Sequence, residues 1–183
     1  MTRSEMTQTA ISAPHNQLTP AELNYLIVDE SRFDRTILTN SLMAFGARNT
    51  VETRDAFRAI RILANEDIHM VLVSYDLKNM NGIELTNHIR RGDDLPDPEI
   101  PIIMISSNTD HGAVLKARNA GIHEFLAKPF SPENLYLRIH TTIFQPRPFI
   151  REEGYVGPDR RWLNKGGPEN RDRREPHPKV NLL

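Results

Sequence analysis

The fold is decided by the stretch Met70–Gly82, which reads Met-Val-Leu-Val-Ser-Tyr-Asp-Leu-Lys-Asn-Met-Asn-Gly. Its first four residues are apolar, which is typical of a short strand buried on both faces of a sheet. The apolar run ends at Ser74, a polar loop follows, and a helical pattern begins near Gly82. A buried strand followed by a loop and a helix is the repeating unit of an open parallel sheet.

Three further apolar runs repeat this design, and each is followed by sequence with helical periodicity. A weaker, peripheral strand is expected at Asn49–Glu52. The alternation predicts a doubly wound, five-stranded parallel sheet with helices on both faces. In such sheets the ligand crevice lies beyond the carboxyl ends of the strands. The strand-end side chains that we expect to meet in one pocket are Asp29, Glu30, Ser74, Ser106 and Lys128.

Composition narrows the class of protein. The chain has 183 residues, 38% hydrophobic content and a net charge of −1, which gives no indication of a nucleic-acid partner. It has no cysteine, so disulfides, thiol catalysis and thiolate metal sites are excluded. No apolar run approaches the roughly 18 to 20 residues that span a bilayer, and the N-terminal residues lack the apolar core of a secretory signal. We therefore expect a cytoplasmic protein without a membrane span.

Three segments differ in composition. Residues 1–22 are polar and are expected to be a disordered leader. Residues 23–145 hold the alternating strands and helices. Residues 146–183 are rich in proline and arginine and poor in aliphatic side chains, so we expect an extended tail that becomes ordered only by docking.

The strand-end residues resemble those of the receiver domain of bacterial response regulators, in particular the stand-alone chemotaxis (CheY-like) type. The resemblance covers about residues 24–145 and rests on the acidic pair Asp29-Glu30, the hydroxyl of Ser106 and the motif Lys128-Pro129-Phe130. It implies a flavodoxin-like receiver fold, a role in two-component phosphorelay signalling, and a histidine kinase or a downstream target as partner. The family is one of signalling proteins, so no enzyme activity is expected.

The resemblance also implies roles for individual residues. In the family the acidic pair holds Mg²⁺, an aspartate after the third strand accepts the phosphoryl group, and a hydroxyl and a lysine bind the phosphoryl oxygens. By position, Asp29 and Glu30 match the metal pair, Ser106 the hydroxyl and Lys128 the ammonium. Phe125 matches the aromatic residue that changes rotamer in receivers that switch.

The chain departs from the family at the acceptor. Ser74 ends the central apolar run and lies eight residues before Gly82, which is the family's spacing for the aspartate. A serine hydroxyl cannot form an acyl phosphate, and Lys78 stands where the family usually has proline. We therefore predict a pseudo-receiver that acts by phosphorylation-independent protein–protein interaction, through its last strand and last two helices.

Two alternatives concern the pocket. Asp76 is a candidate replacement acceptor, although this would require a shorter loop to Gly82; it could instead pair with Lys128 or face solvent. Asp29 and Glu30 either retain Mg²⁺ or form a charge cluster that holds no ion. No other cofactor is expected.

The tail has two interpretations. It is either a solvated linker or a recognition segment that binds a nucleotide second messenger such as a cyclic dinucleotide, because guanidinium groups and aromatic rings suit phosphates and bases. No DNA-binding domain follows the receiver-like part, and a homodimer is left open. The candidate binding residues of the tail are Arg160, Arg161, Trp162, Arg171, Arg173 and Arg174.

Overall fold

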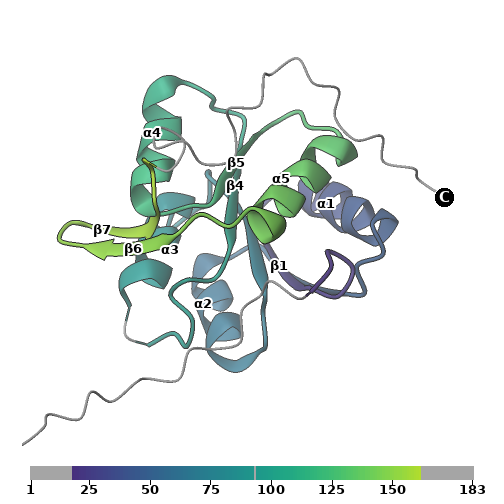
Figure 1. Ribbon diagram of the computed structural model, residues 1–183. Helices are drawn as coiled ribbons and strands as arrows, with labels where there is room; N and C mark the ends of the chain where they lie inside the picture. Colours follow the sequence, from purple (N-terminus) through teal and green to yellow (C-terminus); the bar gives the residue numbers. More distant parts are fainter. Residues whose placement is uncertain (1–17, 93, 162–183) are drawn as a thin grey trace, which may run out of the picture.

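A computed structural model describes residues 18–92 and 94–161 of the chain. In these ranges five parallel strands form one sheet in the order β2-β1-β3-β4-β5 (Figure 1). This order is that of a flavodoxin-like doubly wound sheet, so the predicted fold class is confirmed. The strands are β1 (Asn24–Val28), β2 (Asn49–Thr53), β3 (Met70–Ser74), β4 (Ile102–Ser106) and β5 (Glu124–Ala127).

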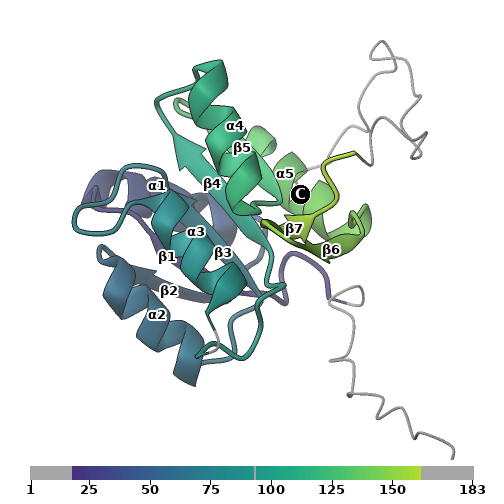
Figure 2. The same cartoon turned by 90° about the vertical axis from the view of Figure 1, so that its left-hand side faces the viewer.

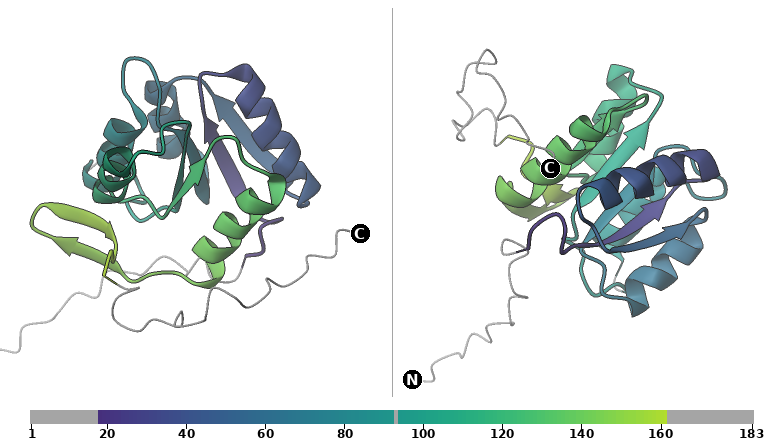
Figure 3. Two further views of the ribbon diagram at one scale, coloured as in Figure 1. Left: turned by 90° about the horizontal axis from the view of Figure 1, so that it is seen from above. Right: turned by 90° about the vertical axis from the view of Figure 1, so that its right-hand side faces the viewer.

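Helices cover both faces of the sheet (Figures 1 and 3). Each begins after a polar residue whose side chain accepts a hydrogen bond from the first helical turn, which satisfies a backbone N–H that has no partner within the helix. None of the helices in the described ranges is long and apolar enough to cross a membrane. The helices are α1 (Arg32–Ala44), α2 (Ala56–Asn65), α3 (Gly82–Arg91), α4 (His111–Ala120) and α5 (Pro132–Phe144).

The central strand β3 separates two hydrophobic cores. Val71 and Val73 face a core built with α2, α3 and α4, whereas Met70 and Leu72 face a core built with α1 and α5. All five residues of β3 are buried. Because successive side chains of a strand point to opposite faces, a continuous apolar run is what this position requires.

The described chain continues past the last helix as a two-stranded antiparallel hairpin (Figures 1 and 2). Its strands are β6 (Phe149–Glu152) and β7 (Tyr155–Pro158), within the segment 146–183 for which we expected an extended tail. The hairpin packs against the C-terminal ends of α3 and α4. Of the expected leader, residues 18–22 are described, and residues 20–22 form a turn.

Arg90, at the end of α3, anchors this hairpin. Its guanidinium donates to the carbonyl oxygens of Gly121 (2.9 Å) and Pro98 (2.7 Å), and it lies 5.4 Å from the ring centre of Phe149. Burial lowers the pKa of Arg90 to about 9, so the group remains charged at neutral pH. The hairpin thus covers a buried cation that belongs to the receiver-like domain.

Gly121 and Gly154 provide a matched test of this packing. Both have positive φ (98° and 83°), so alanine is strained at either position. A Cβ at Gly121 would lie 2.3 Å from the carbonyl oxygen of Val156, whereas a Cβ at Gly154 would meet nothing within 4 Å. Gly121→Ala should therefore lower the free energy of unfolding by about 1–3 kcal/mol more than Gly154→Ala, as overpacked substitutions do.

Urea unfolding of the two variants measures this difference, and amide hydrogen exchange should show earlier opening of residues 149–158 in Gly121→Ala only. Equal losses of stability in the two variants would mean that the hairpin does not pack tightly on the domain.

Candidate functional site

Ser74 is the last residue of β3, at the carboxyl edge of the sheet. It pairs with Ile105 of β4, and its hydroxyl donates to the backbone oxygen of Asp76 at 3.3 Å. The start of α3 packs closely against this strand end, because a Cβ at Gly82 would lie only 2.3 Å from the carbonyl oxygen of Ser74. Asp76 lies in the loop after the strand and is exposed. The side chain at the end of β3 is therefore the hydroxyl of Ser74, and the carboxylate of Asp76 follows two residues later in the loop.

The ammonium of Lys128, just after β5, lies between two carboxylates. Its Nζ donates to Oδ2 of Asp29 and to Oδ2 of Asp34, at 2.8 Å in each case. Asp29 is 3% exposed. The two contacts join the end of β1, the first turn of α1 and the end of β5 across the crevice predicted from the sequence.

Asp34 was missed by the sequence analysis. It lies in the first turn of α1, and its backbone N–H donates to the capping hydroxyl of Ser31. A carboxylate in the first turn is common because it complements the helix dipole, so its position alone indicates only a helix start. One signal in the sequence could have identified Asp34 as a site residue. It lies only four residues after the acidic pair, so it adds a third carboxylate near the same strand end.

Glu30 turns away from Asp29 toward the loop after β3. One carboxylate oxygen accepts a hydrogen bond from the backbone N–H of Lys78, and the other lies 3.3 Å from the Lys78 ammonium. Arg35 of α1 holds the backbone of the acidic pair by donating to the carbonyl oxygens of Asp29 (2.7 Å) and Glu30 (3.2 Å). The two acidic residues thus have separate basic partners.

The residues present do not fit a magnesium site. Asp29 uses one oxygen for Lys128 and the other for the backbone N–H of Ser31 (2.8 Å), and both oxygens of Glu30 contact Lys78. Ser74 supplies no further carboxylate. Across residues 18–92 and 94–161, no three His, Cys, Asp or Glu side chains come together in a way that could hold a metal ion. Mg²⁺ prefers several oxygen ligands in octahedral geometry, which this arrangement does not offer.

The predicted pocket hydroxyl and the predicted switch aromatic have local contacts. Ser106 ends β4 and is 1% exposed, and its hydroxyl oxygen accepts a hydrogen bond from the backbone N–H of Asn108 at 3.0 Å. Phe125 of β5 is half-buried and packs at the edge of the core formed with α2, α3 and α4.

The charge on Lys128 is set by its neighbours. Burial acts to lower the pKa of the ammonium, but the hydrogen bonds that it donates to Asp29 and Asp34 outweigh this effect, and the pKa is raised. A group whose pKa is raised by folding contributes stability that is lost only as the pH rises through the folded pKa. The Lys128 ammonium therefore stays charged at neutral pH.

Of the tail candidates, two are described and both have partners. Arg160 lies 3.9 Å from the ring centre of Tyr155 and donates to the side chain of Asn119. Arg161 forms an ion pair with Glu152 at 3.1 Å. Trp162, Arg171, Arg173 and Arg174 lie outside the described residues, so nucleotide binding by the tail stays a prediction.

The chain is similar in sequence to chemotaxis proteins of other bacteria. The chemotaxis protein CheY homolog of Campylobacter jejuni is 31% identical over 114 residues, which cover 62% of this chain and 86% of the relative. CheY1 of Helicobacter pylori is 30% identical over 122 residues, covering 66% of this chain and 97% of the relative.

Solved structures share the fold. The receiver domain of the sensor histidine kinase PA1611 from Pseudomonas aeruginosa, solved with a magnesium ion in its active-site cleft, has a TM-score of 0.59 at 24% identity, over 67% of this chain and 98% of that one. A putative response regulator from Chloroflexus aurantiacus has a TM-score of 0.62 at 22% identity, over 66% of this chain and 97% of that one. The family model for the response regulator receiver domain matches residues 25–140, and the chain belongs to this family.

Proposed function

We propose that this receiver is a cytoplasmic interaction module of two-component-type signalling that works without a phosphoryl group. The observation that carries the proposal is Ser74 at the tip of β3, where a hydroxyl occupies the position that we assign to the acceptor. An aspartyl acceptor forms an acyl phosphate, and a serine hydroxyl cannot. Ser74 is also 5% exposed and directs its proton to the Asp76 carbonyl, so it is a poor nucleophile.

The positive charge of the cleft supports the same proposal. An arriving phosphoryl group needs cations that are available to neutralise it. Here Lys128 is shared by Asp29 and Asp34, and Lys78 contacts Glu30. The internal carboxylates therefore take the place that an incoming anion would need, and both lysines are paired before any partner arrives.

The partner-binding surface that we propose is formed by α4, β5 and α5, with signalling proteins such as a histidine kinase or a downstream target as partners. Two exposed apolar side chains, Leu115 of α4 (46% exposed) and Phe144 of α5 (45%), lie on these helices. Since Lys128 is fixed, we expect this surface to keep one conformation and a constant affinity for partners, so that the bound fraction depends on partner concentration alone.

The first test is phosphorylation. Incubation with acetyl phosphate and Mg²⁺ should leave the mass of the intact protein unchanged, because no carboxylate lies at the strand tip. Ser74→Asp/Lys78→Pro should acquire a phosphoryl adduct, because it adds the carboxylate and frees Glu30 for Mg²⁺, and Asp76→Ala serves as the control. An adduct on the wild-type chain that disappears in Asp76→Ala would contradict the proposal and identify Asp76 as the acceptor.

The second test concerns the metal. Calorimetric titration should detect no saturable binding of Mg²⁺ to the wild-type chain, because every oxygen of the acidic pair has a protein partner. Lys78→Pro removes both the ammonium and the N–H that contact Glu30, whereas Lys78→Ala removes the ammonium alone. Affinity for Mg²⁺ should therefore be highest in Ser74→Asp/Lys78→Pro, intermediate in Ser74→Asp/Lys78→Ala and lowest in the wild type.

Wild-type binding of Mg²⁺ as tight as that of Ser74→Asp/Lys78→Pro would show that the lysines do not replace the metal.

A further inference from the structure

Strand β2 lies at the edge of the sheet and pairs on one side only. Among the described strands its partner is β1 alone (Figure 2). The N–H of Asp29 donates to the carbonyl oxygen of Thr53 at 3.1 Å, so the backbone groups of Thr53 face β1. Because these groups alternate in direction along a strand, Thr50 and Glu52 direct their N–H and C=O groups to the outer edge. This edge can accept one further strand.

A groove of about 530 Å³ lies at the carboxyl end of this edge. Residues of α1, β2 and α2 and of the loop between β2 and α2 form its wall, and four of them are arginines. The lining residues are Arg35, Glu52, Thr53, Arg54, Asp55, Arg58 and Arg61.

The two carboxylates of the groove are engaged in local structure. Glu52 accepts hydrogen bonds from the guanidinium of Arg35 at 3.1 Å and from the hydroxyl of Thr39 at 2.7 Å. Asp55 caps α2 by accepting a hydrogen bond from the backbone N–H of Arg58 at 2.8 Å. Neither carboxylate forms an ion pair with the arginines of α2 in the described ranges.

The other three arginines of the groove, Arg54, Arg58 and Arg61, are exposed. Their side chains form no ion pair with any residue that the structure describes. The helix gains nothing from them, because Arg58 lies at the positive end of the dipole of α2 and Arg61 follows three positions later, where like charges repel. The groove therefore presents cations that are available to an anionic partner.

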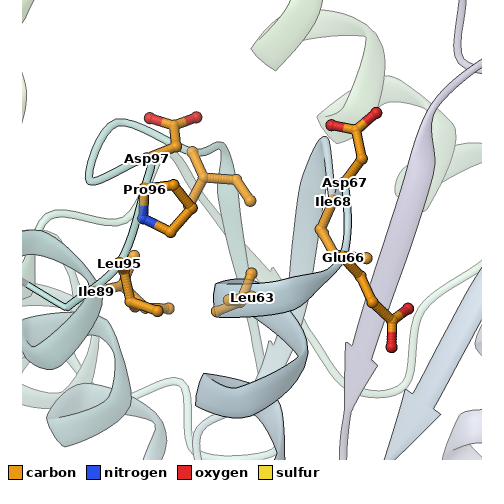
Figure 4. Close-up of a pocket in the computed structure, with 9 residues that line it drawn as sticks. Leu63, Glu66, Asp67, Ile68, Ile89, Leu95, Pro96 and Asp97 are labelled. Atoms are coloured by element: carbon orange, nitrogen blue, oxygen red, sulfur yellow. The ribbon is translucent and has the colours of Figure 1, made fainter.

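The other end of α2 has the opposite charge. Glu66 and Asp67 follow the helix and, with Asp97, line a hollow of about 270 Å³ that has no lysine or arginine among its lining residues (Figure 4). In Figure 4 the carboxylates of Asp67 and Asp97 stand on the two sides of this hollow. An acidic partner is repelled there and attracted to the end of α2 that carries Arg58. Charge thus determines which end of α2 such a partner contacts.

We propose that the outer edge of β2 and the arginine groove together bind an extended acidic segment of another protein. The segment adds a strand to the sheet by pairing with the backbone groups of Thr50 and Glu52, as peptides do that bind sheet edges. Its aspartate or glutamate side chains contact Arg54, Arg58 and Arg61. The backbone pairs supply affinity, and the charge pairs select acidic segments.

The chain itself offers no such segment outside the described ranges. Residues 1–17 have one arginine and one glutamate, and residues 162–183 have five lysines or arginines against three acidic residues. A second copy is disfavoured as well, because pairing of two β2 edges would bring together two sets of arginines. β2 and β5 are opposite edges of the sheet, so an acidic segment on β2 leaves the α4–β5–α5 surface accessible.

Fluorescence anisotropy with a labelled synthetic peptide of nine alternating glutamates and valines tests the charge contacts. The wild-type chain should bind it saturably, with an affinity that falls as salt is added. Arg58→Gln/Arg61→Gln should raise the dissociation constant at least about tenfold, because it removes two charge-assisted contacts. Arg91→Gln/Arg151→Gln is the matched control, since it removes the same charge beside the hairpin, and it should leave the dissociation constant within about twofold.

A second pair of variants tests the backbone contacts. Thr50→Pro removes an N–H that faces the outer edge, a place where proline is tolerated, whereas Thr50→Ala keeps this N–H. Thr50→Pro should raise the dissociation constant about fivefold, the effect of one lost hydrogen bond, and Thr50→Ala should leave it unchanged. Matching circular dichroism spectra show that both variants are folded. A peptide methylated at every backbone nitrogen keeps the charge and should bind the wild-type chain at least about tenfold more weakly.

Absence of saturable peptide binding to the wild-type chain would overturn the proposal. Equal binding of the methylated peptide, or equally tight binding of inorganic triphosphate, would also overturn it, because the arginines would then recognise charge without a paired strand. Equal loss of affinity in Arg58→Gln/Arg61→Gln and in its control would place the binding site elsewhere on the molecule.

Discussion

The arrangement of this receiver depends on the position of one cation. The Lys128 ammonium lies 2.8 Å from a carboxylate at the end of β1 and 2.8 Å from another in the first turn of α1. These contacts join residues 94 and 99 positions apart in the chain. Removing Lys128 would leave the nearly buried carboxylate of Asp29 without its cation, which is costly. These two ion pairs therefore connect the carboxyl ends of β1 and β5 with the start of α1.

Other polar groups at the carboxyl edge of the sheet also have partners within the chain. Lys78 contacts Glu30 through both its backbone and its side chain, and the Ser74 hydroxyl is bonded within its own loop. At the opposite end of the sheet, Arg90 is buried under the hairpin that follows α5, and its hydrogen bonds go to backbone carbonyls. In each place an internal lysine or arginine contacts the oxygens around it.

Much of the fold could be predicted from the sequence, because its signals are local. Each buried strand is a continuous apolar run that ends at a polar residue. Capping residues mark the helix starts, and Gly46, Gly92 and Gly121 follow the ends of α1, α3 and α4. The placement of Ser74 at a strand tip followed from the same run, and the register with β4 agrees with it. Parallel sheets have few arrangements, so five such units were enough to predict a doubly wound sheet.

Other features could not be predicted, because they depend on contacts between distant residues. Asp34 resembles an ordinary helix-start acid until the fold brings Lys128 to it. The hairpin lies in a segment whose proline and arginine content indicated an extended tail, although Gly154 at its turn and apolar residues on both sides are typical of a hairpin. Its stability comes from packing on Arg90 and Gly121, which composition does not reveal.

The most direct test of this account is a double-mutant cycle between Lys128 and Asp34, followed by urea unfolding at neutral pH. Lys128→Met, Asp34→Asn and the double variant give the coupling free energy between the two side chains. We expect a favourable coupling of about 1–2 kcal/mol, within the range measured for residues in direct contact. A coupling indistinguishable from zero would mean that the two groups do not hold the edge of the sheet together, and would contradict the account.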